Sequence, residues 1–279
     1  MSTAIRPLAP VSARHAFALA FDLAMRRDPV QSLLVPLLLR GPWILIPALL
    51  SPVDHPDAGW PVYAISGSAL IVDFILLLIT CGMMRFRARS VFNTPRSAKP
   101  ASVLDCYARS FARLPWLFVT EMVRSLALVF ASLFLLLPGL LLSFRLSCAT
   151  EAVVLDEPHL TGAFGRSFLL TEGRFERWLE MVTLSTLIGL SVIFTMTILA
   201  WIFPQPGIGL WVAATQVVLT FVTTLIQYAW TFFYLRLVEV ESPRVEIGPF
   251  GMRTGGMGDQ PAREAPLEEE PAEAESSSR

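Results

Sequence analysis

Charged residues are scarce in this chain of 279 residues, at 16% of the sequence, whereas a soluble globular domain carries about 25%. Hydrophobic residues make up 54%. A surface with so few charges is typical of a protein that faces lipid rather than water. The composition excludes a disordered chain, a collagen, and a nucleic-acid-binding protein whose charge is spread over a basic surface.

Cysteine and histidine are also rare, with three of each. Cys81, Cys106 and Cys148 are far apart and form no CxxC pair, so neither a disulfide framework nor a zinc site is predicted. The histidines form no HExxH pattern, and no GxSxG, Walker or GxGxxG motif occurs. We therefore expect no metal, no cofactor and no enzymatic activity.

Long apolar runs are what the sequence has in place of charge. Because about 20 residues at 1.5 Å each cross roughly 30 Å of hydrocarbon, the runs predict six spans, at about 30–50, 61–84, 115–137, 140–156, 181–203 and 208–235. Pro138-Gly139 is a turn signal between the third and fourth. The fourth is shorter and carries Arg145 and Glu151. Two interpretations of this fourth run stay open: it crosses the membrane, or it is a re-entrant segment.

The basic residues set the expected orientation. The connection 85–114 carries seven of them and 157–180 adds three arginines, whereas 51–60 and 204–207 have none. Basic loops stay in the cytoplasm, which places both termini there and requires an even number of crossings between 114 and 157. Of the 22 basic residues only Lys99 is a lysine, which favours a bacterial source, and hence the inner membrane.

The predicted fold is all-α, with the six transmembrane helices arranged as three hairpins. Arg109-Ser110-Phe111 recurs as Arg166-Ser167-Phe168, which suggests that a cytoplasmic interfacial helix precedes each hairpin. Residues 1–29 form the first such amphipathic segment, and 30–238 the membrane domain. Residues 239–279 hold ten acidic residues against four arginines and predict a disordered acidic tail.

Charges inside the spans are the sharpest signal, because each costs about 2.5–3.5 kcal/mol at a helix centre. They could form a polar pathway or pair with one another, and their balance favours pairing. Arg40 and Asp73 lie at nearly equal depth in the first hairpin, so we expect a charge-assisted hydrogen bond between them. The six intramembrane charges are Arg40, Asp73, Glu121, Arg124, Arg145 and Glu151.

A second cluster of charge directly follows the second predicted span. Arg85, Arg87 and Arg89 fall in the connection that we assign to the cytoplasm. Such a juxtamembrane cluster can contact anionic lipid, at roughly 1 kcal/mol per residue. Orientation of the chain alone would also account for these arginines, and the two interpretations are compatible.

The segment 151–175 carries the most distinctive pattern of the chain, A-x-x-R-S-x-x-L-T-x-G-R. It resembles a segment of bacterial polytopic proteins related to the membrane domain of glycerophosphoryl diester phosphodiesterase. The resemblance implies six spans with interfacial helices between them, and no catalytic residue, because the chemistry of that enzyme belongs to a separate soluble barrel. The matching positions are Ala163, Arg166, Ser167, Leu170, Thr171, Gly173 and Arg174.

These features favour a non-catalytic inner-membrane protein, either a scaffold or a lipid-associated component of the envelope. Its expected partners are membrane lipids and other membrane proteins, and not nucleic acid. A transporter or permease that uses the buried charges is the alternative, and a membrane enzyme that acts on lipid headgroups is a third. The oligomeric state is not indicated by the sequence.

Overall fold

The computed structural model describes residues 12–50, 59–94, 100–134, 136–156, 159–203 and 208–241. Within these ranges every regular element is helical and no strand is present. Two π-helical stretches, Asp22–Arg27 and Val30–Leu34, connect the first two α-helices. The α-helices are α1 (Ala13–Phe21), α2 (Val35–Leu49), α3 (Trp60–Asn93), α4 (Val103–Phe134), α5 (Leu136–Arg145), α6 (Ala149–Leu155), α7 (Leu160–Thr171), α8 (Phe175–Ile202) and α9 (Ile208–Glu241).

Six helical stretches are long and apolar enough to cross a membrane, which confirms the prediction of an all-helical, multi-pass membrane protein. Their positions follow the predicted spans, although several extend further. They are Val30–Pro47, Trp60–Asn93, Val103–Leu133, Leu137–Leu155, Phe175–Ile202 and Gly209–Val240.

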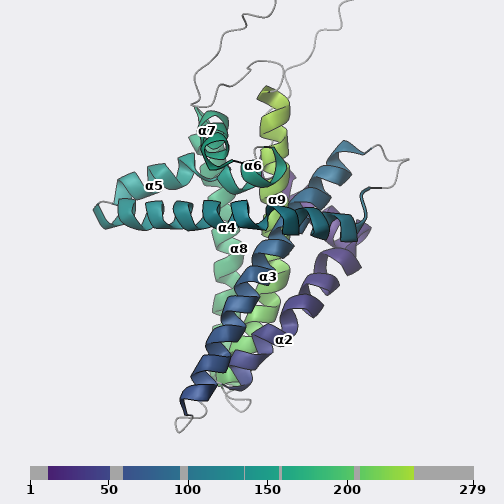
Figure 1. The fold of residues 1–279 in the computed structure, drawn as a ribbon, viewed down its shortest axis with the longest axis vertical. Coiled ribbons are helices and arrows are strands. Elements are labelled where there is room, and N and C mark those ends of the chain that lie inside the picture. The colour runs from purple at the N-terminus through teal and green to yellow at the C-terminus, as the bar shows by residue number, and fades with distance from the viewer. Residues whose placement is uncertain are drawn as a thin grey trace, which may run out of the picture.

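The long helices do not all run in the same direction (Figure 1). Helices α2, α3, α8 and α9 extend lengthwise together, and α9 packs against each of the other three. Helix α4 crosses this group, and α5 turns back along α4. In this view the short helices α6 and α7 lie above α4, beside the C-terminal end of α9.

The ends of the predicted segments need correction at two places. Residues 85–93 were assigned to a connection, but they continue α3 as helix. Glu239 was assigned to the disordered tail, but it lies on α9, where its carboxylate accepts a hydrogen bond from Arg236 Nη1 at 2.6 Å. The remainder of the tail, 242–279, and the first eleven residues lie outside the described residues.

The fourth predicted span, 140–156, is not one continuous helix. A turn at residues 146–148 divides it into the end of α5 and the whole of α6. At 1.5 Å per residue, α5 and α6 are only about 15 Å and 10 Å long, so neither crosses a bilayer alone. All seven residues of α6 are buried, so α6 contacts other parts of the protein rather than lipid.

A serine holds each copy of the repeated Arg-Ser-Phe triplet against another segment. Ser110 Oγ donates to the carbonyl of Ile79 on α3 at 2.6 Å, and Ser167 Oγ donates to the carbonyl of Arg145 at 2.6 Å. Both serines are buried. A Cβ atom on Gly82 would lie 2.1 Å from Ser110 Oγ. The crossing of α3 and α4 therefore depends on a glycine at that position.

We predict that Gly82→Ala destabilises the protein, because the new methyl group must displace Ser110 and its hydrogen bond, at a typical cost of about 1–3 kcal/mol. Gly67→Ala is the matched control on the same helix, since nothing lies within 4 Å of a Cβ there. Both substitutions gain the same helix propensity. Thermal unfolding in detergent should show a lower melting temperature for Gly82→Ala than for Gly67→Ala. Equal melting temperatures would contradict the close crossing.

Candidate functional site

A cavity of about 380 Å³ lies where α3, α4, α6, α8 and α9 meet. Its volume falls in the range of roughly 300–1,000 Å³ that is typical of small-molecule sites. Apolar side chains form much of its wall, including Phe74, Leu117, Leu128, Trp178, Val182 and Trp230. The polar part of the wall includes Arg85, Glu121, Arg124, Thr150, Glu151 and Gln227.

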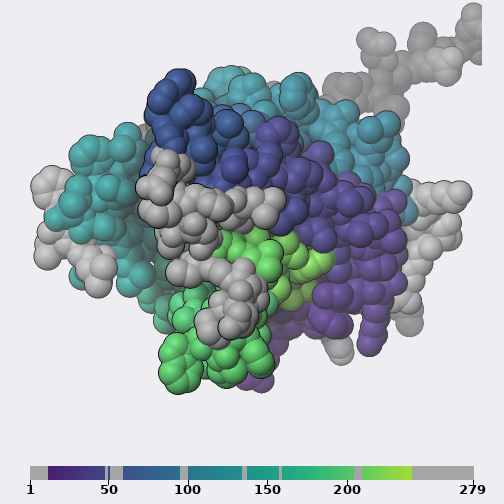
Figure 2. Space-filling model, turned by 90° about the horizontal axis from the view of Figure 1, so that it is seen from below, coloured from purple at the N-terminus to yellow at the C-terminus, as the bar shows by residue number. Residues whose placement is uncertain are grey.

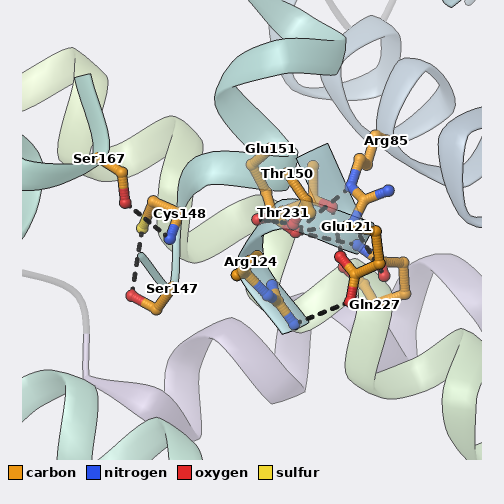
Figure 3. A network of polar contacts seen from close by, with 10 residues as sticks. All are labelled: Arg85, Glu121, Arg124, Ser147, Cys148, Thr150, Glu151, Ser167, Gln227 and Thr231. Carbon is orange, nitrogen blue, oxygen red and sulfur yellow. Dashed lines mark hydrogen bonds and ion pairs between the residues drawn. The ribbon is translucent and has the colours of Figure 1, made fainter. Parts of the chain in front are cut away.

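Glu151 is the centre of the polar wall (Figure 3). Its side chain is only 4% exposed. Arg85 donates to Oε1 from Nε at 3.3 Å and from Nη2 at 3.2 Å, and Gln227 Nε2 donates to the same oxygen at 3.2 Å. Thr150 Oγ1 donates to Oε2 at 3.0 Å. A buried carboxylate is tolerated when both oxygens have such partners, and these partners connect α6 to α3 and α9.

Glu121 and Arg124 provide the polar groups of α4. They form an ion pair within one turn of the helix, with Nη2 and Oε1 3.1 Å apart. Their side chains are 24% and 27% exposed, so the cavity reaches the protein surface beside them.

Two hydrogen-bond donors of the cavity wall have no acceptor. Arg124 Nε and Trp178 Nε1 are buried atoms without a hydrogen-bond partner in the part of the chain that the structure describes. Trp178 is 2% exposed. Because most buried donors find an acceptor, this pair indicates a place for an acceptor-bearing ligand.

The predicted pairing of Arg40 with Asp73 is confirmed. Arg40 Nε donates to Oδ1 and Nη2 to Oδ2, both at 2.8 Å, in a two-pronged contact between α2 and α3. The side chains are 8% and 18% exposed. Arg40 Nη1 also lies 3.5 Å from Thr220 Oγ1 of α9, so one arginine joins three helices.

The other intramembrane charges are paired only in part as the sequence suggested. Glu121 and Arg124 pair with each other, whereas Glu151 pairs with Arg85, which was not among the six. Arg145 donates from Nη1 to the carbonyl of Phe168 at 3.2 Å, and its guanidinium also lies over the ring of that residue. Structural roles therefore account for these contacts, with the free Nε of Arg124 as the exception.

Two of the three arginines in the cluster Arg85, Arg87 and Arg89 are not presented to lipid as the sequence suggested, because α3 continues through the cluster. Arg85 and Arg87 are buried, and Arg87 pairs with Asp28. Arg89 Nη1 lies 3.4 Å from Asp156 Oδ1. Arg85 and Arg87 thus have carboxylate partners inside the protein, which is the physical reason for the correction. Arg89 is 40% exposed, and its contact with lipid stays a prediction.

The seven positions of the family-like motif lie on α7 and directly after its C-terminal end. Ser167 Oγ accepts a hydrogen bond from the Cys148 amide at 3.1 Å, and Thr171 Oγ1 donates to the Ser167 carbonyl at 2.9 Å. Gly173 has a φ of 68°, which favours glycine because it carries no Cβ. Of the remaining positions, Ala163 and Leu170 are buried, Arg166 lies on the same helix, and Arg174 Nη1 donates to the Leu170 carbonyl.

Sequence reasoning missed Trp178, Gln227 and the partners Asp28 and Asp156. Gln227 is a polar residue within a long apolar run, which is a signal that could have identified it. No comparable signal marks Trp178, because its place in the cavity wall depends on packing between segments far apart in the chain, such as its contact with the ring of Phe144. Among the described residues, no group of three His, Cys, Asp or Glu could hold a metal ion.

Comparison of the chain with protein-family models, curated proteins and solved structures found no match. The relation to the membrane domain of glycerophosphoryl diester phosphodiesterase therefore stays a prediction from the motif.

We predict that Arg40→Leu and Asp73→Leu each lower the yield of folded protein, because each leaves one ion unpaired in an apolar environment. The double variant should recover much of the loss, since it leaves no unpaired charge. Size-exclusion chromatography in mild detergent measures the folded fraction. Arg26→Leu is the control, because Arg26 is 77% exposed and its pair with Asp22 is long, at 3.9 Å. Equal losses in the single and double variants would contradict a structural role for the pair.

Proposed function

We propose that this protein is a non-catalytic, multi-pass membrane protein that binds a phospholipid by its headgroup in the cavity beside Arg124 and Trp178. The observation that carries the proposal is the pair of unpartnered donors, Arg124 Nε and Trp178 Nε1, in a cavity with an otherwise largely apolar wall. Phosphate oxygens are strong acceptors for a guanidinium and for an indole N–H. The apolar wall suits the adjoining glycerol and acyl chains.

The charge of the cavity favours a zwitterionic headgroup over an anionic one. Arg85 and Arg124 are balanced by Glu121 and Glu151, so a ligand of net negative charge would meet no net attraction. A phosphoethanolamine group matches both signs, with its phosphate at Arg124 and its ammonium group at Glu121. Arg85 and Glu151 already satisfy one another and frame the site.

We place the protein in the inner membrane of a bacterium with both termini in the cytoplasm, as a lipid-associated component of the envelope that works with other membrane proteins. The placement is supported by the contrast between the basic segments 85–114 and 157–180 and the uncharged or acidic connections 51–60 and 204–207. The packing of α1 against α9 agrees with it, because it brings the two ends of the described chain together.

A transporter is the second candidate, and one observation favours it. The break between α5 and α6 lies at the cavity, where Ser147 of the turn is part of the wall. Discontinuous helices often form the substrate sites of transporters. In this alternative the same headgroup would be moved across the membrane rather than held.

We predict that Arg124→Gln and Trp178→Phe each weaken binding of phosphatidylethanolamine by about tenfold, which corresponds to the loss of roughly 1.4 kcal/mol from one hydrogen bond. Native mass spectrometry of the purified protein with added lipid measures the bound fraction. The controls are Arg109→Gln, on the exposed face of α4, and Trp201→Phe, on α8, where Trp201 is 84% exposed. Equal weakening in the controls, or none in the cavity variants, would contradict the proposal.

Lipid movement separates the two candidates. Vesicles that contain the protein and a short-chain fluorescent phosphatidylethanolamine in one leaflet report transfer to the other leaflet. If the protein does not accelerate this transfer over protein-free vesicles, the result supports a protein that binds the lipid without moving it. Acceleration that Arg124→Gln abolishes at unchanged protein content supports transport.

We predict cytoplasmic termini from the distribution of basic residues. A fusion of a protein that fluoresces only in the cytoplasm should be bright at positions 100 and 279 and dark at position 55. Matched amounts of fusion protein on a gel are the control for expression. A dark fusion at 279 would contradict the proposed orientation.

A further inference from the structure

The direction of α4 and α5 sets them apart from the other apolar helices. In Figure 1 α4 passes across the group of lengthwise helices, and α5 lies along α4 at the left. In Figure 2, which is seen from below, teal atoms of this part of the chain project to one side of the other helices. We call residues 115–134 of α4 together with α5 the crosswise arm.

The exposed surface of the crosswise arm is apolar. Leu126, Phe130, Leu133 and Leu137 are 59%, 55%, 75% and 64% exposed. The only ionisable residues between 115 and 145 are Glu121, Arg124 and Arg145, and the structure exposes none of the three fully. An apolar surface of this extent is not stable in contact with water.

Helices α3 and α8 are long enough to cross the hydrocarbon on one side of the arm. Ser110 of α4 contacts α3 at Ile79 and Gly82. From that level to Trp60, at the other end of α3, there are about 20 residues, or roughly 30 Å, which is the thickness of the hydrocarbon layer. On α8 the stretch from Trp178 to Ile202 is of similar length. The arm therefore lies near one boundary of this layer.

The fold of the arm also keeps its tip at that boundary. Helix α5 packs along α4, and a Cβ atom on Gly139 would lie 2.4 Å from Ser132 Oγ. The two helices are thus closely packed, and neither α4 nor α5 extends toward the end of the molecule where α3 begins and α8 ends (Figure 1).

We infer that the crosswise arm lies in the acyl layer of a single leaflet, the one on the side of α1, and that the chain crosses the membrane four times rather than six. The occupant of the apolar surface is lipid, because its exposed residues are apolar like those of the candidate span on α8, where Leu187, Leu190 and Phe194 are exposed. The inference does not depend on what the cavity binds.

Labelling of single introduced cysteines tests the number of crossings. Leu137→Cys, at the tip of the arm, is compared with Trp60→Cys and Phe203→Cys, which mark the far ends of α3 and α8, and with Arg14→Cys on α1. A membrane-impermeant maleimide is applied to intact cells and to inside-out vesicles. Mass spectrometry identifies the labelled residue, so the native cysteines can stay. We expect Trp60→Cys and Phe203→Cys to react from one side and Arg14→Cys from the other.

The tip of the arm decides the result. Leu137→Cys should not react from the side on which Trp60→Cys and Phe203→Cys react. Reaction from that side would show that α4 and α5 each cross the membrane and would overturn the inference. None of the four cysteine variants changes a cavity residue, so the outcome is separate from the lipid-binding measurements.

Fluorescence quenching tests the occupant of the surface. A bimane attached at Leu133→Cys is measured in vesicles of lipids brominated on their acyl chains, with a bimane at Arg109→Cys as the exposed control outside the arm. We expect at least twofold stronger quenching at Leu133→Cys. No quenching there would show that protein, such as a second copy of this chain, covers the arm, and would overturn the assignment to lipid.

Discussion

One helix, α3, provides a partner for every ion pair that joins separate elements in the described part of the chain. Asp73 binds Arg40 of α2, Arg85 binds Glu151 of α6, and Arg87 and Arg89 bind Asp28 and Asp156 in the connections before α2 and after α6. In a chain with so few charges, an unpaired ion in apolar surroundings is costly. Pairing therefore restricts which segments can surround α3, and the remaining helices pack within that restriction.

The cavity follows from this arrangement. Helix α6 is held beside α3 by Glu151, and α4 crosses α3 at Gly82, so the two enclose a space that α8 and α9 complete. Most polar groups around it are engaged with one another. Arg124 Nε and Trp178 Nε1 are the exceptions, and a structural role does not account for them. This contrast between satisfied and unsatisfied groups is what separates a candidate binding site from a network that only stabilises the fold.

Particular elements show how far local sequence patterns could be interpreted. The pair Arg40–Asp73 was predictable because its two helices are joined by a short connection, so that residue counting alone gives their relative depth. The pair Arg85–Glu151 was not predictable, because the partners are 66 residues apart. The hydrophobic periodicity of the sequence does not indicate how their two helices lie relative to each other. For the arginines after residue 84 the sequence predicts a cytoplasmic connection, since polarity alone does not distinguish a residue in solvent from one in a buried ion pair.

The sequence by itself determined that this is an all-helical, multi-pass membrane protein, because apolar runs of about 20 residues are a local property that the thickness of the bilayer selects. It also determined the first ion pair. The turn predicted at Pro138-Gly139 is wrong in position, because both residues lie inside α5, where packing against α4 overrides the local turn signal. Only the tertiary structure decided that α4 crosses the other helices, that 140–156 is divided and its α6 part buried, and that Trp178 and Arg124 line the same cavity. These features depend on packing between segments far apart in the chain, where shape complementarity and charge pairing, rather than hydropathy, select the arrangement.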